Sequence, residues 1–332
     1  MSCPFFSILL PAFNARAHIG RTLRDLLGQT FGDFEILVVD DGSSDGTDGI
    51  VRGYSDARIR LIRLDSNQGL VGALNAGLAE ARGLWVARQD ADDRCHPDRL
   101  ARQRELTLQS PEAVLFYSWA TLIDHRGWWR GTLRPPLRDG DLRWDLCFRN
   151  AIPHTSAVFP TKIVRDQLGG YSGDNVTADF DLWSRLLRVG SAVGEARCLV
   201  SYRNHPGSIM GRENAAVKKK STEGLREILR GNLREWAQAS DSEAARISEA
   251  WLLPDERGWN DYLSVRERLA SRVGEPAGEV VAEEDYTLMH RALGVSPVCA
   301  ASFLSCLRTV CPLRYAALPQ LRTFLTRLAR GF

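Results

Sequence analysis

Two apolar segments of this chain each end in a group of aspartates, and no other feature restricts its fold as strongly. Residues Glu35–Val39 lead into Asp40-Asp41-Gly42, and residues Trp85–Arg88 lead into Asp90-Ala91-Asp92-Asp93. In a parallel sheet the carboxyl ends of the strands open onto one crevice, where small ligands bind. We therefore expect a sheet whose edge presents carboxylates to a polar ligand.

Residues 1–120 alternate between short apolar segments and amphipathic segments. This alternation predicts an α/β fold of Rossmann-like type, with a mostly parallel central sheet flanked by helices. The expected strands are Phe5–Leu10, Glu35–Val39, Ile59–Leu64, Trp85–Arg88 and Ala113–Tyr117. The expected helices are marked by Ile19, Leu23, Leu26 and Leu27, by Leu70, Leu74 and Leu78, and by the segment from Pro97 to Gln109.

The pattern is less regular after Asp139, and it becomes helical near the C-terminus. The expected elements are a helix near Asp139–Asn150, a strand near Thr155–Phe159, a helix over Phe180–Val189 and a strand over Leu199–Arg203. Beyond Ser208 apolar residues recur at three- and four-residue spacing, which predicts a C-terminal helical extension. We place a domain boundary near residue 210, between a sheet-containing domain (1–210) and the helical extension (211–332).

Composition and charge are those of an ordinary globular protein. The chain has 332 residues, 44% of them hydrophobic, and its net charge of +2 gives no reason to expect a nucleic-acid partner. Its seven cysteines are odd in number and scattered, which disfavours both a disulfide framework and a zinc site. We expect no signal peptide and no membrane-spanning helix, and a cytoplasmic location, with the inner membrane face as a place of peripheral contact.

Asp40 and Asp41 are the first candidate ligand-binding residues. A carboxylate held at a strand end can accept hydrogen bonds from a base edge or a ribose hydroxyl. The alternative is that one of the two caps the helix expected after Gly42-Ser43-Ser44.

Asp90, Asp92 and Asp93 place three carboxylates within four residues. Such groups repel one another unless a cation or solvent intervenes, and Mg²⁺ or Mn²⁺ binds through one or two carboxylates together with substrate phosphates. The alternative is a solvated acidic turn.

Asp179 and Asp181 open the helix expected at Phe180–Val189. Acidic residues are common in a first helical turn because they complement the helix dipole. A carboxylate there can also serve as a general base, if it reaches the hydroxyl that it deprotonates.

Taken in order, these segments resemble glycosyltransferase family 2, whose members have the GT-A fold. The resemblance covers roughly residues 5–210 and rests on motifs that are weak singly but specific in their order and spacing. The matching motifs are Pro11-Ala-Phe-Asn14, Val39-Asp-Asp-Gly-Ser43, Asn67-x-Gly69 with Ala73-x-Asn75, Asp90-Ala-Asp-Asp93, Gly169-Gly-Tyr171 and Ala178-Asp-Phe-Asp-Leu-Trp183.

The resemblance implies a role for each matched position. The residues expected to contact the nucleotide sugar are Pro11, Ala12, Phe13, Asn14, Asp40, Asp41, Asn67, Gly69, Asp90, Ala91 and Asp92. Asp92 and Asp93, with His205, would hold the divalent metal, and Asp179 would be the catalytic base. The family usually carries Glu-Asp where this chain has Ala178-Asp179, so the aspartate is kept and its acidic neighbour is lost.

The implied reaction is an inverting, single transfer of a sugar. The donor would be a nucleoside-diphosphate sugar, UDP-sugar being favoured, and the acceptor a glycan or lipid-linked hydroxyl in glycan, lipopolysaccharide or cell-surface polysaccharide biosynthesis. Processive synthases of the family carry Gln-x-x-Arg-Trp, but here Gly140 precedes Arg143-Trp144. Two other hypotheses stay open: a catalytically silent nucleotide-sugar-binding module, and a sugar-phosphate nucleotidyltransferase, which should have a glycine-rich loop where Pro11-Ala-Phe-Asn14 stands.

The segment 286–332 contains no acidic residue and interleaves arginines with leucines and phenylalanines. It is expected either to lie on an anionic membrane surface or to pack as an ordinary basic helix on this chain or on a second subunit.

Overall fold

The computed structural model describes residues 3–204 and 215–252. These residues form two compact units. The first contains the described residues of 3–142, 150–204 and 215–225, and the second those of 143–149 and 226–252. The proposed boundary near residue 210 stays a prediction, because it falls outside the described residues.

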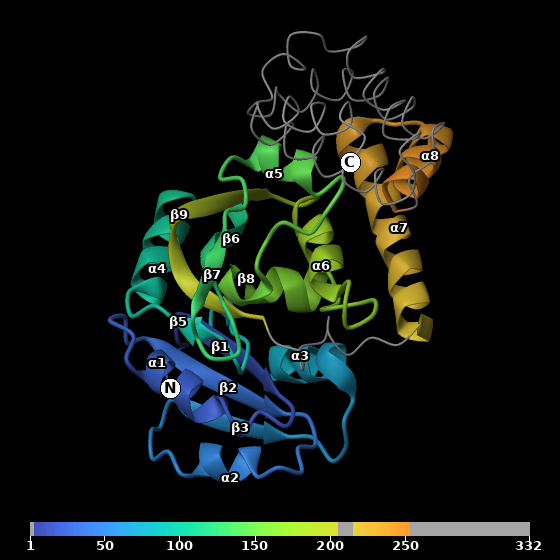
Figure 1. The fold of residues 1–332 in the computed structure, drawn as a ribbon. Helices are drawn as coiled ribbons and strands as arrows, with labels where there is room; N and C mark the ends of the chain where they lie inside the picture. Colours follow the sequence, from blue (N-terminus) through green and yellow to red (C-terminus); the bar gives the residue numbers. More distant parts are fainter. Residues whose placement is uncertain (1–2, 205–214, 253–332) are drawn as a thin grey trace, which may run out of the picture. The chain divides into compact units, whose positions relative to one another are not determined.

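A single mixed sheet organises the first unit (Figure 1). Its strands are β1 (Phe6–Ala12), β2 (Phe34–Asp40), β3 (Ile59–Arg63), β4 (Trp85–Arg88), β5 (Arg94–Cys95), β6 (Ala113–Ile123), β7 (Trp129–Leu133), β8 (Val158–Pro160) and β9 (Ser191–Arg203). The order is β3-β2-β1-β4-β8-β6-β9-β5, and β7 pairs with β6. The β3, β2, β1 and β4 strands are parallel, as is the pair of β6 and β9, whereas β8, β5 and β7 pair antiparallel.

Helices cover both faces of the parallel part of the sheet. The helices among the described residues are α1 (Ile19–Leu27), α2 (Thr47–Arg52), α3 (Gly69–Glu80), α4 (Arg99–Gln109), α5 (Asp139–Asp145), α6 (Ala178–Leu186), α7 (Ala215–Ala237) and α8 (Asp241–Leu252), with a 3₁₀ turn at His154–Ser156 and a π turn at Ile163–Gln167. Side chains of α1, α2 and α4 join one core cluster with Ile8, Leu10, Ile36 and Val38. The α3 helix packs on the opposite face, where a Cβ at Gly77 would lie only 2.3 Å from Leu9 Cδ1.

The α/β class and most of the elements agree with the sequence-based expectation. Because β1 and β2 are buried on both faces, they appear in the sequence as mostly apolar segments, interrupted only by Ser7 in β1 and by Glu35 before the final Asp40 of β2. The expected strand at Thr155–Phe159 was wrong in its first part, where the chain forms the 3₁₀ turn before β8. The expected helix at Asp139–Asn150 ends at Asp145, and the short strands β5 and β7 were not expected.

None of the helices that the structure describes is both long and apolar enough to cross a bilayer.

Candidate functional site

Asp40, the last residue of β2, is completely buried. Its Oδ1 accepts the backbone N–H of Ser43 at 3.1 Å, and its Oδ2 lies 3.4 Å from Nη1 of Arg63. The N-cap of α2 is Gly46, and no side chain caps that helix end. The interpretation that Asp40 or Asp41 caps the helix after Ser44 is therefore wrong, and Asp40 instead holds the turn that follows the strand.

Asp41 ties the end of β2 to the start of α3. Its two carboxylate oxygens accept the backbone N–H groups of Gln68 at 2.7 Å and Gly69 at 2.9 Å. Asn67 Oδ1 accepts the N–H of Gly69 as well, at 3.1 Å. A Cβ at Gly69 would lie 3.1 Å from Nδ2 of Asn175, in the loop before α6. The Asn67-x-Gly69 motif therefore contacts Asp41 on one side and the loop before α6 on the other.

The Pro11-Ala-Phe-Asn14 motif spans the end of β1 and the loop that follows it. The Asn14 backbone, at φ +50°, lies in the left-handed region, and its N–H donates to Oγ of Ser43 at 2.9 Å. The N–H of Ser44 donates in turn to Asn14 Oδ1 at 3.0 Å. Phe13 projects from this tied loop with 44% of its surface exposed, so its ring is available to a flat ligand.

The Asp90–Asp93 segment is a loop between β4 and β5, and its three aspartates have different surroundings. Asp90 pairs with Nη2 of Arg88 and remains partly exposed. Asp93 is 1% exposed, and its Oδ1 accepts the backbone N–H of Arg203 at 2.7 Å. A solvated acidic turn is therefore wrong for Asp93, while Asp92 is the partly exposed member beside it.

Burial and mutual repulsion act on this acidic loop together. Burial, with the charges of Asp90 and Asp92, raises the pKa of Asp93 well above its ordinary value. Burial also raises the pKa of Asp90, an effect that the adjacent Arg88 partly opposes. Like charges held this close favour a cation between them.

Arg88 is a functional candidate that sequence reasoning missed. Its guanidinium is completely buried, although it lies in a strand. Besides pairing with Asp90, it donates from Nε to Nε2 of His154 at 3.0 Å and from Nη1 to the carbonyl of Leu9 at 3.1 Å. Burial and the charge of Arg88 lower the pKa of His154 well below its ordinary value. His154 is thus a neutral acceptor in this network, and its Nε2 lies 3.0 Å from the hydroxyl of Tyr171.

Tyr171 belongs to the Gly-Gly-Tyr motif and is clamped by Asn75 of α3. The Nδ2 of Asn75 donates to the carbonyl of Tyr171 at 2.9 Å, and the N–H of Tyr171 donates to Oδ1 of Asn75 at 2.8 Å. A Cβ at Gly170 would lie 2.5 Å from that same oxygen, and the Gly170 φ is +81°, so only glycine fits there. The Ala73-x-Asn75 motif therefore orders the loop ahead of α6.

Asp179 lies in the first turn of α6 and is partly buried. Its Oδ1 accepts the N–H of Phe180 at 2.8 Å, and its Oδ2 accepts Nδ2 of Asn150 at 2.9 Å. Burial raises the pKa of Asp179 to about 6, and the charge of Asp90 contributes. Asp181 is different, because it pairs with Arg185 Nη2 at 2.7 Å. Asp179 therefore has the pKa expected of a base that works near neutral pH.

The pKa of Tyr202, near the end of β9, is affected both by the acidic loop and by Asp179. Burial raises its pKa, and the charges of four carboxylates raise it further. They are, in decreasing order of effect, Asp90, Asp93, Asp92 and Asp179. The acidic loop and the start of α6 thus act on the same phenol, and no pattern in the sequence singles this residue out.

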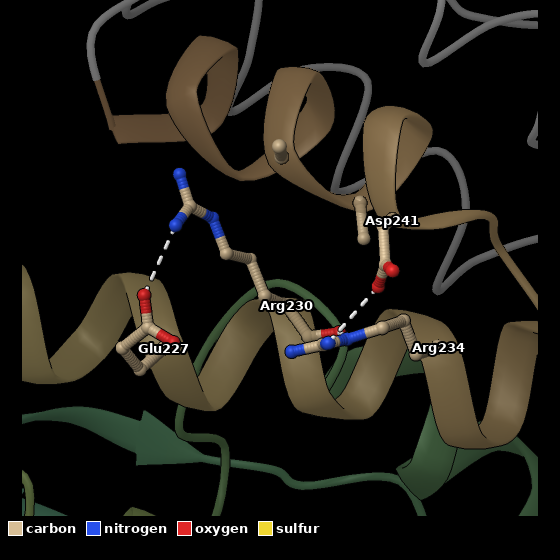
Figure 2. Close-up of a pocket in the computed structure, with 6 residues that line it drawn as sticks. Glu227, Arg230, Arg234 and Asp241 are labelled. Carbon is tan, nitrogen blue, oxygen red and sulfur yellow. Dashed lines mark hydrogen bonds and ion pairs between the residues drawn. The ribbon is translucent and has the colours of Figure 1, made fainter.

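A cavity of about 260 Å³ lies between α7 and α8 in the second unit (Figure 2). Arg230 pairs there with Glu227 at 3.0 Å, and Arg234 pairs with Asp241 at 3.0 Å. Since these charges pair with one another, the cavity is a polar seam between two helices and carries none of the expected site residues. His205 and the segment 286–332 lie outside the described residues.

Comparisons with known proteins agree with the geometry. The model of glycosyl transferase family 2 matches residues 7–165. The chain is 32% identical over 221 residues to TuaG of Bacillus subtilis (strain 168), a glycosyltransferase assigned to teichuronic acid biosynthesis, covering 65% of this chain and 85% of that protein. It is 43% identical over 102 residues to the succinoglycan biosynthesis protein ExoO of Rhizobium meliloti (strain 1021), covering 31% and 29%.

Two solved structures share the fold at lower identity. S. aureus TarS 1–349 in complex with UDP-GlcNAc has a TM-score of 0.59 and 18% identity, covering 92% of this chain and 90% of that one. The mannosyltransferase PcManGT of Pyrobaculum calidifontis, in complex with GDP-Man and Mn²⁺, has a TM-score of 0.51 and 16% identity, covering 94% and 89%.

Proposed function

Because the chain belongs to glycosyltransferase family 2, we propose that it transfers one sugar from a nucleoside-diphosphate sugar to an acceptor hydroxyl with inversion at the anomeric carbon. The observation that carries this proposal is Asp179, a carboxyl with its pKa raised to about 6 beside the acidic loop. A base of that pKa is mostly ionised at neutral pH, yet it still takes up a proton readily.

In this mechanism Asp179 accepts the proton of the incoming hydroxyl as its oxygen bonds to the anomeric carbon. The bond from that carbon to the diphosphate breaks on the opposite face, and the electron pair leaves with the diphosphate. The amide of Asn150 and the N–H of Phe180 hold the carboxylate in one orientation, which supports a fixed direction of attack.

We propose that the chain uses a divalent cation, Mn²⁺ or Mg²⁺, at the acidic loop. The raised pKa values of Asp90 and Asp93 support this fit, because a cation would relieve the repulsion that contributes to them. Within the described residues, no group of three or more His, Cys, Asp or Glu side chains is placed to hold a metal ion. The chain would therefore contribute few ligands, as cations of this class require when substrate phosphates supply the others.

Asp92 is the ligand that we favour in this loop. Its side chain is partly exposed, whereas Asp93 is buried and its Oδ1 accepts the backbone N–H of Arg203. When bound, the metal would stabilise the negative charge of the departing diphosphate. Asp93 and His205 stay predictions as metal ligands.

The donor end would use the residues around β1 and β2. Phe13 and the loop held by Asp40 and Asp41 would contact the base and ribose, and Asn67, Gly69 and Ala91 would shape the pocket. We favour a UDP-sugar as the donor, which the complex of TarS with UDP-GlcNAc supports as a precedent in the same fold. The carboxylate oxygens of Asp41 already accept two backbone amides, so its remaining lone pairs would serve the base.

The acceptor would be a glycan or a lipid-linked glycan in cell-surface polysaccharide biosynthesis. The assignments of TuaG and ExoO to teichuronic acid and succinoglycan biosynthesis support that class. We propose a single transfer per encounter, since Gly140 replaces the glutamine of the processive motif.

A thermal-shift screen followed by a transfer assay tests this function. We expect UDP with Mn²⁺ to raise the melting temperature, because a ligand that binds only the folded state stabilises it by mass action. The same nucleotide should then be released from its sugar donor when a suitable acceptor glycan is added. Nucleotide binding without release on any acceptor would favour the silent binding module instead.

A further inference from the structure

The turn between β6 and β7 exposes two adjacent tryptophans. Trp128 and Trp129 are each 67% exposed, and every residue from His125 to Arg130 is exposed. Large aromatic side chains are normally buried to a high degree, so a pair left open at a turn indicates a contact surface. We call residues 125–130 the tryptophan tip.

The tryptophan tip is held by a defined turn. Asp124 and Trp128 pair through the backbone at 3.0 Å, and Asp124 Oδ1 accepts the N–H groups of Arg126 and Trp128, each at 2.9 Å. Gly127, at φ +88°, occupies the left-handed position that this turn requires. Both indoles are therefore presented by an ordered backbone.

Arg203 joins the base of this turn to the acidic loop. Its Nη1 donates to the carbonyl of Asp124 at 2.9 Å, and its Nε donates to the carbonyl of Asp92 at 2.8 Å. Whatever the tip binds is thus held at a fixed place relative to the proposed site of transfer.

The charge around the indoles is positive. Arg126 and Arg130 are exposed in the tip, and Asp124 is the only carboxylate among residues 124–130. That carboxylate is 8% exposed, and Arg130 pairs with it. The tip therefore presents aromatic and cationic groups together, without an accessible acid.

We propose that the tryptophan tip seats the protein on an anionic membrane surface, with both indoles at the level of the lipid headgroups. Indoles favour this zone because one part of the ring system is apolar while the N–H can still reach water. Arginines beside them are attracted to the negative surface potential of anionic lipids. This inference goes beyond the proposed function and requires no donor, metal or catalytic residue.

Two other occupants fit these observations less well. A sugar-binding surface usually has hydrogen-bond acceptors beside its aromatic rings. The carboxylate of Asp124 does not serve in this way, because it already accepts the N–H groups of the turn and pairs with Arg130. A second copy meeting the tip across a twofold axis would bring Arg126 and Arg130 toward their own equivalents. Lipid is the partner whose charge complements the tip.

Vesicle flotation of the full-length protein tests the proposal. The probes are vesicles of phosphatidylcholine alone and of phosphatidylcholine with about 30 mol% phosphatidylglycerol, at low and high salt. The test variant is Trp128→Ala/Trp129→Ala. The matched control is Leu84→Ser/Leu108→Ser, which removes two apolar side chains that are 56% and 58% exposed elsewhere. Trp128→Phe/Trp129→Phe keeps aromatic rings in the turn, and thermal unfolding verifies that each variant folds.

We expect the wild type and the control to float with anionic vesicles and to bind them less at high salt. The double alanine variant should bind about tenfold less, with the phenylalanine variant between the two. Flotation of the folded alanine variant equal to that of wild type would overturn the proposal, as would equal binding to neutral and anionic vesicles. A loss of dimer in light scattering with flotation unchanged would assign the tip to a second copy. UDP binding, measured on the same samples, tests the proposed function separately.

Discussion

The amide of Asn150 donates a hydrogen bond to Oδ2 of Asp179 at 2.9 Å. This bond favours the ionised carboxylate and so lowers the pKa of Asp179, against the larger effect of burial that raises it to about 6. Asn150 therefore lowers the pH at which the proposed base becomes active.

The rate of transfer should depend on pH through Asp179. The base must be ionised, so kcat should be level above pH 7 and fall about tenfold per pH unit well below 6. A steady-state pH profile with saturating donor measures this. A profile that stays level down to pH 4.5 would exclude Asp179 as the base.

Asn150→Ala should shift that profile toward higher pH by up to about one unit, because the ionised carboxylate loses a donor. Asn204→Ala, at an exposed asparagine, is the matched control and should leave the profile in place. An unchanged profile in both variants would contradict the role given to Asn150.

Asp179→Asn should not destabilise the fold at pH 8. The pKa of Asp179 in the folded chain lies above its ordinary value of 3.8, so the ionised group opposes folding above pH 6, and this cost disappears as the pH falls below about 4. The difference between these two pKa values corresponds to at most about 3 kcal/mol of free energy of unfolding, and the partial solvent exposure of Asp179 reduces that figure. Urea unfolding at pH 8 should give a free energy of unfolding equal to or above that of wild type. A free energy of unfolding more than about 1 kcal/mol below that of wild type would contradict the conclusion that ionised Asp179 opposes folding.

Arg88→Met should destabilise the chain by about 3–5 kcal/mol, because it leaves Asp90 and its buried surroundings without their cation. Arg102→Met breaks a surface ion pair with Glu105 and should cost less than about 1 kcal/mol. Chemical denaturation of both variants gives the comparison. Equal losses in the free energy of unfolding would mean that the buried network of Arg88 stabilises the chain no more than a surface ion pair does.

Gly77→Ala should destabilise by about 1–3 kcal/mol, since the new Cβ would lie 2.3 Å from Leu9 Cδ1 and 2.7 Å from Val39 Cγ2. Gly49→Ala, in helix α2, meets nothing within 4 Å and should stabilise by about 0.5–1 kcal/mol. A melting temperature that falls for Gly77→Ala and rises for Gly49→Ala would verify that α3 packs closely on the sheet.

Asp92→Asn should abolish any Mn²⁺-dependent rise in melting temperature with UDP and lower activity at least about a hundredfold. Glu112→Gln, at an exposed acid directly before β6, should change neither. Metal dependence that survives in the Asp92 variant would remove Asp92 from the set of ligands.

The elements that were predictable from sequence are those whose burial leaves a regular pattern. β1 and β2 are entirely buried and mostly apolar, and α1 places Ile19, Leu23 and Leu26 on one buried face. β5 has only two residues and β7 begins with exposed ones, so neither leaves such a pattern.

The site was predictable where it follows strand ends and not where partners come from distant segments. The aspartates after β2 and β4 could be located because parallel strands end at one edge. The burial of Arg88 could not, since its partner His154 is 66 positions away in the chain. Nor could the effect of four carboxylates on the pKa of Tyr202, which depends on how β9 pairs with β6.

The central claim, that a carboxylate at the start of α6 deprotonates the acceptor beside the acidic loop, is tested most directly by measuring transfer and donor binding together in Asp179→Asn. We predict that the variant binds UDP-sugar within about threefold of wild type by calorimetry, while single-turnover transfer falls by at least about a hundredfold. Transfer at the wild-type rate by a variant with normal donor binding would contradict the account.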